Sequence, residues 1–209
     1  MTDAPDRATP EPLPRKHTVP DAPNSPMTPT EVYSALSAVW PVGSVLVTES
    51  TSTMAQQRDW LPTIRSGSFY ATASGGIGWG VPAAVGVALG DRARGVERTV
   101  VATIGDGSFQ YSVQAIWTAA QHDLPIIFVV MRNEEYSILK AFALLEKTPG
   151  VPGMDLPGLD IASIATCFVC RAVHANTSEQ LAEQFATALT AQGPTVIVVQ
   201  TQPMMAHLG

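Results

Sequence analysis

Charged residues, cysteines and clusters of basic residues are all scarce in this sequence. Only 14% of the 209 residues are charged and two are cysteine, whereas 45% are hydrophobic and the mean hydropathy is +0.14. Two cysteines exclude a disulfide scaffold, and the low charge excludes a chain that is disordered throughout. The net charge of −6, without clustered Lys and Arg, argues against binding to the nucleic-acid backbone. We therefore expect no nucleic-acid partner.

Segments that would direct the chain to a membrane are also lacking. Residues 1–29 contain Asp3, Asp6 and Glu11 and no apolar run of signal-peptide length. Residues 66–90 carry no charge and are long enough to span a bilayer, but they are mainly Gly, Ala, Ser and Thr, with Pro82 among them. We expect this stretch to lie between protein layers, and the protein to be cytoplasmic with no membrane partner.

Proline divides the chain into two parts. Eight of the seventeen prolines lie in residues 1–29, which have too few apolar residues to fold alone. We interpret residues 1–29 as a Pro-rich disordered linker or tail, and residues 30–209 as one domain.

Strand and helix patterns alternate through residues 30–209. Short apolar runs predict strands at 44–48, 98–104, 125–131, 168–173 and 195–201. Longer patterns predict helices at 30–39, 52–60, 78–90, 109–122, 136–146, 161–166 and 177–192, the last with a capping box from Thr177 and Gln180. Strands that are apolar on both faces and alternate with helices are typical of an α/β fold. We predict a doubly wound parallel sheet with helices on both faces.

The strongest chemical motif is Gly105-Asp106-Gly107-Ser108, which lies between a predicted strand and a predicted helix. Ligands of parallel sheets bind at the carboxyl ends of strands, where glycines allow the backbone to approach them closely. Free N–H groups at a helix start suit a phosphate, and Asp106 is a hard oxygen ligand of the kind that Mg²⁺ prefers. Alternatively, Asp106 simply caps a helix within a Gly-rich turn.

A second element points to the same edge of the sheet. Asn133 follows the next predicted strand, and a right-handed crossover places the carboxyl ends of both strands side by side. Asp106 and Asn133 are therefore expected to converge on one cation, with a nearby backbone carbonyl, diphosphate oxygens and water as further ligands.

This combination resembles the diphosphate-binding domain of thiamine-diphosphate-dependent enzymes, and within that superfamily it is most similar to the benzoylformate decarboxylases. The similarity extends from about residue 26 to residue 201. The stretches that carry it are residues 49–53, 74–78, 82–84, 104–108, 117–121 and 149–158.

The resemblance implies roles for individual residues. Asp106, Asn133 and the backbone carbonyl of Glu135 would hold Mg²⁺. Ile77 would force thiamine diphosphate into a bent shape, and the Gly75 carbonyl would accept a hydrogen bond from its amino group. The full set of implied cofactor-binding residues is Thr51, Ser52, Gly75, Ile77, Gly105, Gly107, Ser108 and Tyr136.

The substrate pocket is less well defined by the resemblance. Ile138 and Phe142 would help to form its wall, with plain core packing as the alternative for both residues.

The sequence departs from the family pattern in two ways. Arg132 replaces the first Asn of the usual pair, and Glu134 and Glu135 add negative charge beside a diphosphate unless their side chains point to solvent. In addition, the family's catalytic glutamate and histidines lie in an N-terminal domain that has no counterpart here. The resemblance therefore implies no catalytic residue in this chain, a complementary pyrimidine-binding domain or subunit, and a homo- or hetero-oligomer.

Three functional hypotheses remain open. The resemblance implies part of a decarboxylase of 2-oxo acids, with aromatic ones favoured. A carboligase similar to acetolactate synthase is the second, and a truncated chain that binds cofactor or partner without turnover is the third.

Two other motifs are weaker. The glycines of residues 76–80 do not fit a dinucleotide fingerprint, because the third is one place early and no suitably placed acidic residue follows. Cys167 and Cys170 form a CxxC pair at a helix end, without a second pair for zinc, and we interpret both as small buried residues.

Overall fold

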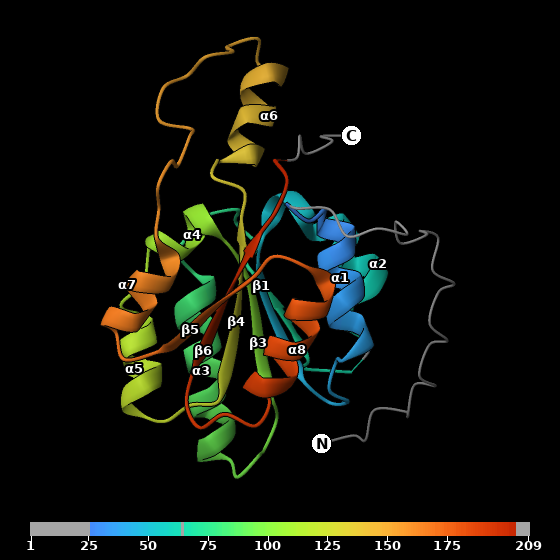
Figure 1. The fold of residues 1–209 in the computed structure, drawn as a ribbon, viewed down its shortest axis with the longest axis vertical. Helices are drawn as coiled ribbons and strands as arrows, with labels where there is room; N and C mark the ends of the chain where they lie inside the picture. Colours follow the sequence, from blue (N-terminus) through green and yellow to red (C-terminus); the bar gives the residue numbers. More distant parts are fainter. Residues whose placement is uncertain (1–25, 64, 204–209) are drawn as a thin grey trace, which may run out of the picture.

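The computed structural model describes residues 26–63 and 65–203, and within them it contains a single sheet of six strands. Every neighbouring pair is parallel, and the order is β2-β1-β3-β4-β6-β5 (Figure 1). The strands are β1 (Val45–Glu49), β2 (Phe69–Ala71), β3 (Val100–Gly105), β4 (Ile126–Arg132), β5 (Arg171–Ala175) and β6 (Thr195–Gln200). The predicted α/β fold with a parallel sheet is confirmed.

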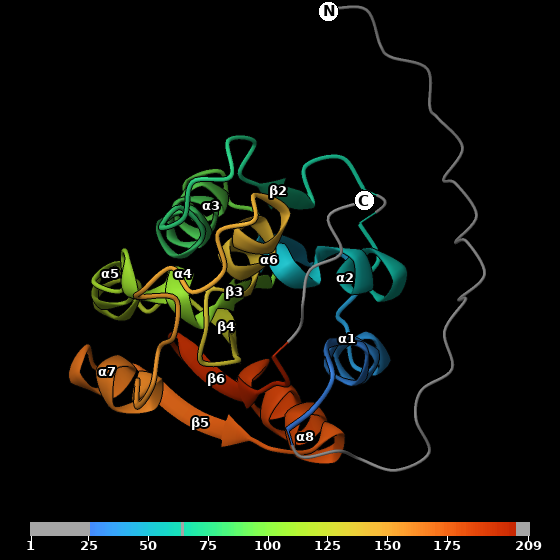
Figure 2. The same cartoon turned by 90° about the horizontal axis from the view of Figure 1, so that it is seen from above.

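Helices cover both faces of this sheet. Figure 2 shows α1 (Pro29–Ala38), α2 (Met54–Trp60) and α8 (Ser178–Ala188) on one side. The other side carries α3 (Gly80–Ala93), α5 (Ala115–Gln121) and α7 (Ile161–Cys167). Two short elements, the 3₁₀ turn η1 (Thr51–Thr53) and α4 (Asp106–Gln110), directly follow β1 and β3, and α6 (Ser137–Leu145) stands beyond the carboxyl edge of the sheet (Figure 1).

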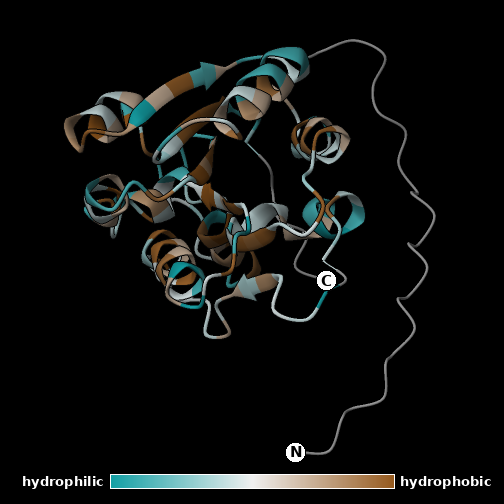
Figure 3. Cartoon of the chain, turned by 90° about the horizontal axis from the view of Figure 1, so that it is seen from below, coloured by the Kyte–Doolittle hydropathy of each residue, from teal (hydrophilic) through white to brown (hydrophobic). Residues whose placement is uncertain are grey.

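The central strands are apolar on both faces because each face meets a helix layer. Along β4, Ile126, Phe128 and Val130 join the core under α3 and α5, whereas Ile127 and Val129 join the core under α1 and α8. Each fully buried side chain of this kind contributes about 1.5–3 kcal/mol. Figure 3 shows hydrophobic residues both in the central part of the sheet and on the helices around it.

The bounds of most elements differ from the prediction by a few residues, as in α8, which ends at Ala188 and not at residue 192, and three differences are larger. The predicted helix 109–122 is two helices, α4 and α5, because the backbone between them tightens into i→i+3 bonds such as Ala115 N–H to the Ser112 carbonyl. The predicted strand 168–173 begins only at Arg171, because the N–H groups of residues 168–170 still bond to the end of α7. The three-residue strand β2 was not predicted.

The folded domain also begins a few residues earlier in the sequence than predicted. Met27 is buried, and its N–H donates to the Gln200 carbonyl (3.0 Å). Thr28 caps α1 and forms a capping box with Glu31. Residues 26–29, which we assigned to the tail, are therefore part of the fold, and the rest of the predicted tail lies outside the described residues.

The capping box predicted at α8 is only half formed. Thr177 accepts the N–H of Gln180 as expected (3.2 Å), but the Gln180 side chain accepts the N–H of Asn176 and not that of Thr177. The helix still gains the cap on one of its first N–H groups.

The uncharged stretch 66–90 is divided between β2, a loop and the 14-residue α3. Among the described helices, none has both the length and the apolar character needed to cross a membrane.

The buried carboxylate of Asp91 connects α3 to the segment before β3 at the amino edge of the sheet. The Asp91 carboxylate accepts bonds from Arg98 Nε and Nη2 (both 2.8 Å) and from Arg94 Nη2 (2.6 Å). Hydrogen bonds from Arg98, together with those from Arg94, hold the pKa of Asp91 below its usual value despite burial.

We predict that Asp91→Asn lowers the free energy of unfolding by about 2 kcal/mol at pH 7, because charge-assisted bonds to two arginines are lost. A carboxyl group whose pKa is lower in the folded state stabilises the fold above its unfolded pKa, and this contribution disappears as the pH falls through the lowered value. The stability difference between wild type and variant should therefore shrink as the pH falls below the ordinary carboxyl range. Urea titrations at several pH values measure this, with the exposed Glu97→Gln as control. A difference that is independent of pH would contradict the prediction.

Candidate cofactor and metal site

The candidate site lies where β3 and β4 end side by side. Gly105 at the end of β3 is paired with Met131 on β4, so the residues that follow both strands emerge at one edge. Asp106 is the first residue of α4, and Asn133 follows β4 directly. The structure thus brings together the two segments that the sequence predicted to converge.

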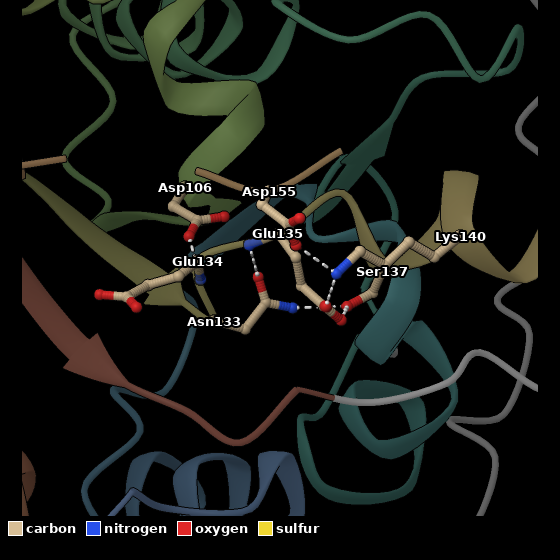
Figure 4. Close-up of polar contacts among 7 residues, drawn as sticks. All are labelled: Asp106, Asn133, Glu134, Glu135, Ser137, Lys140 and Asp155. Atoms are coloured by element: carbon tan, nitrogen blue, oxygen red, sulfur yellow. Dashed lines mark hydrogen bonds and ion pairs between the residues drawn. The ribbon is translucent and has the colours of Figure 1, made fainter. Parts of the chain in front are cut away.

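The Asp106 carboxylate joins these two segments. It is 2% exposed; Oδ1 accepts the N–H of Gly107 (2.8 Å) and Oδ2 accepts the N–H of Glu134 (2.7 Å) (Figure 4). Burial raises the pKa of Asp106, although these N–H groups and that of Asn133 oppose the shift. A carboxylate offers about four acceptor positions, so Asp106 keeps capacity for a cation, which would offset the cost of its burial.

The turn after Asn133 presents further oxygen donors. Glu134 has a left-handed backbone (φ 60°), and its carbonyl accepts the N–H of Leu156 (2.8 Å). Tyr136 N–H donates to the Met154 carbonyl (2.8 Å), and these two bonds flank Glu135 without using its carbonyl. The Asn133 side-chain oxygen, the Asp106 carboxylate and the Glu135 carbonyl are all hard donors that suit Mg²⁺.

This donor set contains only one carboxylate. Accordingly, no group of three or more His, Cys, Asp or Glu side chains within residues 26–63 and 65–203 is placed to hold a metal. A cation here would depend on amide and backbone oxygens, and on oxygens supplied by a ligand.

Each of the two glutamates beside the site forms an ion pair with a nearby cation. Glu134 pairs with Arg132 (2.5 Å), and Glu135 pairs with Lys140, which also bonds to Asp155 (2.6 Å). Asp155 and Glu135 raise the pKa of Lys140. Figure 4 shows the Glu134 carboxylate pointing away from Asn133. The Glu134 charge is therefore balanced by Arg132, whereas Glu135 shares the single charge of Lys140 with Asp155.

Glycine at position 107 is required by the ring of Tyr136. A Cβ atom on Gly107 would lie 2.3 Å from Cε1 and 2.7 Å from Cδ1 of that ring. At Gly105, in contrast, the nearest atoms would be 3.8 Å away, the Glu49 carbonyl oxygen and the Ser108 hydroxyl. The first glycine of the motif leaves open space beside the backbone, and the second allows Tyr136 to pack on α4.

The predicted diphosphate ligands follow neighbouring strands. Thr51 and Ser52 lie in η1, directly after β1, and are half-buried, whereas Ser108 lies in α4 and is buried. Since β1 and β3 are neighbours in the sheet, all three lie at the same edge.

Glu49 is a structural residue of the site that sequence reasoning did not single out. Its buried carboxylate accepts the N–H groups of Trp79 (3.0 Å) and Gly80 (2.9 Å) at the start of α3. It thereby ties the end of β1 to the loop that contains Gly75, which has a left-handed φ of 70°, and the half-buried Ile77. The sequence feature that could have indicated this role is the position of a glutamate at the end of an apolar strand.

The predicted substrate-pocket residues lie on α6, one turn apart. Phe142 is 46% exposed and Ile138 is half-buried, so core packing within the described residues does not account for Phe142. A cavity of about 440 Å³ lies beside α6, but it is lined by Glu135, Lys140 and Leu144 among others, and by neither of the predicted residues.

The CxxC cysteines differ from each other. Cys170 is buried, its thiol donates to the Pro194 carbonyl (3.2 Å), and burial raises its pKa to about 12. Cys167 is exposed, because it lies at the end of α7, so its predicted burial was wrong.

A parallel α/β sheet with helices on both faces, and with carboxylate, amide and hydroxyl groups where its strands end, is typical of α/β proteins that bind a ligand at the carboxyl edge of the sheet. Comparison with known proteins identifies the family within this class. Residues 47–199 match the C-terminal TPP binding domain of the thiamine pyrophosphate enzymes, and the chain belongs to this family.

Individual relatives agree with the family assignment. Benzoylformate decarboxylase of Pseudomonas aeruginosa is 38% identical over 94% of this chain and 36% of its own length. A provisionally assigned thiamin diphosphate-dependent enzyme of Mycobacterium smegmatis is 57% identical with a TM-score of 0.83, covering 98% of this chain and 37% of its own. The thiamine diphosphate-dependent 4-hydroxybenzoylformate decarboxylase of Rhodococcus jostii RHA1 is 33% identical with a TM-score of 0.86, and the match covers 96% of this chain and 37% of that protein. The chain spans little more than a third of the length of these relatives.

We predict that Gly107→Ala lowers the free energy of unfolding by about 1–3 kcal/mol, because the new Cβ overpacks against the Tyr136 ring. Gly105→Ala is the matched control: its backbone (φ −71°, ψ 149°) suits any residue, and the change should stay within about 0.5 kcal/mol. Urea unfolding without cofactor measures both. Equal effects of the two substitutions would show that Tyr136 is not the constraint.

Proposed function

We propose that this chain is the Mg²⁺- and thiamine-diphosphate-binding C-terminal part of a 2-oxo acid decarboxylase of the benzoylformate decarboxylase type. The observation that carries the proposal is the buried Asp106 carboxylate, bonded to the turn after Asn133 in a chain that belongs to the thiamine pyrophosphate enzymes. An aromatic 2-oxo acid is the favoured substrate, which is supported by the similarity to benzoylformate decarboxylases.

In this proposal the cation is held by Asp106, Asn133 and the carbonyl of Glu135. The choice of these ligands rests on their hard oxygen atoms and on their position at the ends of β3 and β4. The role of Asp106 is supported by the acceptor positions that its buried carboxylate has left after bonding to two N–H groups.

The remaining cofactor contacts are assigned to the loops around this edge. The hydroxyl groups of Thr51, Ser52 and Ser108 would hydrogen-bond the diphosphate. The loop tied down by Glu49 would place the Gly75 carbonyl and the Ile77 side chain against the organic part of the cofactor. The backbone of the Gly105 and Gly107 motif and the Tyr136 ring packed on it complete the proposed binding set.

When bound, the cofactor supplies a carbon nucleophile and an electron sink for decarboxylation, and this chain supplies position and electrostatics. Ile138 and Phe142 on α6 would face an aromatic substrate. We assign no proton-transfer residue to this chain. We propose that such residues are provided by a complementary pyrimidine-binding domain or subunit. The complete enzyme would be an oligomer in the cytoplasm, where the free thiols of Cys167 and Cys170 stay reduced.

We predict that thiamine diphosphate binds the chain only with Mg²⁺, and that Asp106→Asn weakens this binding at least about 10-fold, because a ligand charge is lost. Isothermal titration with and without Mg²⁺ measures the affinities. Asp123→Asn, on the turn before β4, is the matched control and should bind as wild type. Binding that is independent of the metal and of Asp106 would contradict the proposed site.

We further predict that co-expression with the N-terminal remainder of the Mycobacterium smegmatis relative yields an enzyme that converts benzoylformate to benzaldehyde and CO₂. Product analysis separates this outcome from a carboligase, which would form an acetohydroxy acid from pyruvate. A complex that binds cofactor and Mg²⁺ but turns over neither substrate would favour the third hypothesis, a chain that binds the cofactor without turnover. Asp106→Asn in the same complex is the control for cofactor dependence.

A further inference from the structure

A continuous series of polar contacts leads from the surface of α6 to the side chain of Asn133 (Figure 4). Lys140 bonds to the carboxylates of Asp155 and Glu135. The other oxygen of Glu135 accepts the hydroxyl proton of Ser137 (2.5 Å). The Ser137 oxygen in turn accepts the side-chain N–H of Asn133 (2.8 Å).

The donors and acceptors in this series leave one orientation for the Asn133 amide. An ionised carboxylate only accepts, so Ser137 must give its proton to Glu135 and can offer only a lone pair to Asn133. That lone pair selects the amide nitrogen. On the other side, the Glu135 N–H donates to the amide oxygen (3.3 Å). A flipped amide would place its NH₂ group against the Glu135 N–H, which is also a donor.

The oriented amide matters because only its oxygen is a cation ligand. Ser137 is buried, so the hydroxyl cannot exchange its partners freely with water. In the part of the chain that the structure describes, Lys140 is the only cationic side chain bonded to Glu135. Lys140 also bonds to Asp155, which lies between two residues, 154 and 156, whose backbones pair with the turn after β4.

We propose that Lys140, Glu135 and Ser137 are positioning residues that orient the Asn133 side chain, with its carbonyl oxygen kept available for the divalent cation. This inference rests on the proposed function for the identity of the ligand, but the orientation itself is a property of the chain alone. The side chain of Glu135 thereby has a role separate from that of its backbone carbonyl.

The orientation is tested first in the full chain without cofactor. The sequence contains three asparagines, Asn24, Asn133 and Asn176, so selective ¹⁵N-asparagine labelling gives few side-chain NH₂ signals, and Asn133→Asp assigns the relevant one. We expect the Asn133 NH₂ protons to exchange with water more slowly than those of the exposed Asn176. Lys140→Met and Ser137→Ala should abolish this protection, Lys140→Arg should preserve it, and Lys147→Met, a matched change in the turn after α6, should leave it intact.

The consequence for the cation is tested by titration of Mg²⁺ at saturating thiamine diphosphate. Residues that orient a metal ligand typically contribute 10- to 100-fold in affinity, so we expect the apparent Kd for Mg²⁺ to rise about 10-fold in Lys140→Met and Ser137→Ala. Lys140→Arg and Lys147→Met should bind as wild type. Unfolding curves of each variant identify any that fail to fold.

The two experiments separate this inference from the proposed function. If wild type does not bind Mg²⁺ and cofactor, the proposed function fails, while the exchange data still decide the orientation. Unchanged protection of the Asn133 amide in both folded variants would overturn the inference. So would unchanged Mg²⁺ affinity in both variants of a chain whose wild type binds.

Discussion

The ends of two neighbouring strands are joined by one buried carboxylate. Asp106 accepts backbone N–H groups from its own helix start and from Glu134 beyond β4, so a single anion sets the relative position of both segments. Backbone donors that converge on a buried carboxylate leave little freedom, because an unpaired N–H group or an unpaired charge would be costly there. Tyr136 follows the same turn and packs on Gly107, which adds a steric limit to the electrostatic one.

Glu49 repeats this principle one strand away. It fixes the start of α3 as Asp106 fixes the turn after β4, and the hydroxyl-bearing turn η1 lies directly after it. The loops at this edge of the sheet are thus held by internal carboxylates, together with the backbone pairing of residues 134–136 with residues 154–156. The outer charges act differently: Glu134 and Glu135 pair with Arg132 and Lys140 at half-exposed positions, where ion pairs contribute little energy but still fix geometry.

The sequence was sufficient to predict the features that depend on local pattern. Strands apolar on both faces predict the parallel sheet, and from that sheet the convergence of Asp106 and Asn133 follows by topology. The contacts of Lys140 with Asp155 could not be predicted, because Asp155 lies in an irregular segment whose place is set by backbone pairing with residues 134–136. The break between α4 and α5 depends on a local change to i→i+3 bonds, and the exposure of Cys167 on the position where α7 ends, and the apolar pattern indicates neither. The family resemblance provided the expected cofactor and the roles proposed for the other site residues, which no pattern of spacing contains.

The first and last described segments lie against each other. Met27 bonds through its N–H and its carbonyl to Gln200 and Gln202, and the Gln202 side chain reaches the Pro26 carbonyl (3.1 Å). The path of the backbone through the domain is therefore nearly a closed ring, which an exposed loop could open as well as the present ends do. A circular permutant, with residues 26 and 203 joined by a short linker and new ends in the exposed loop near Gly150, would retain every strand pair and both cores.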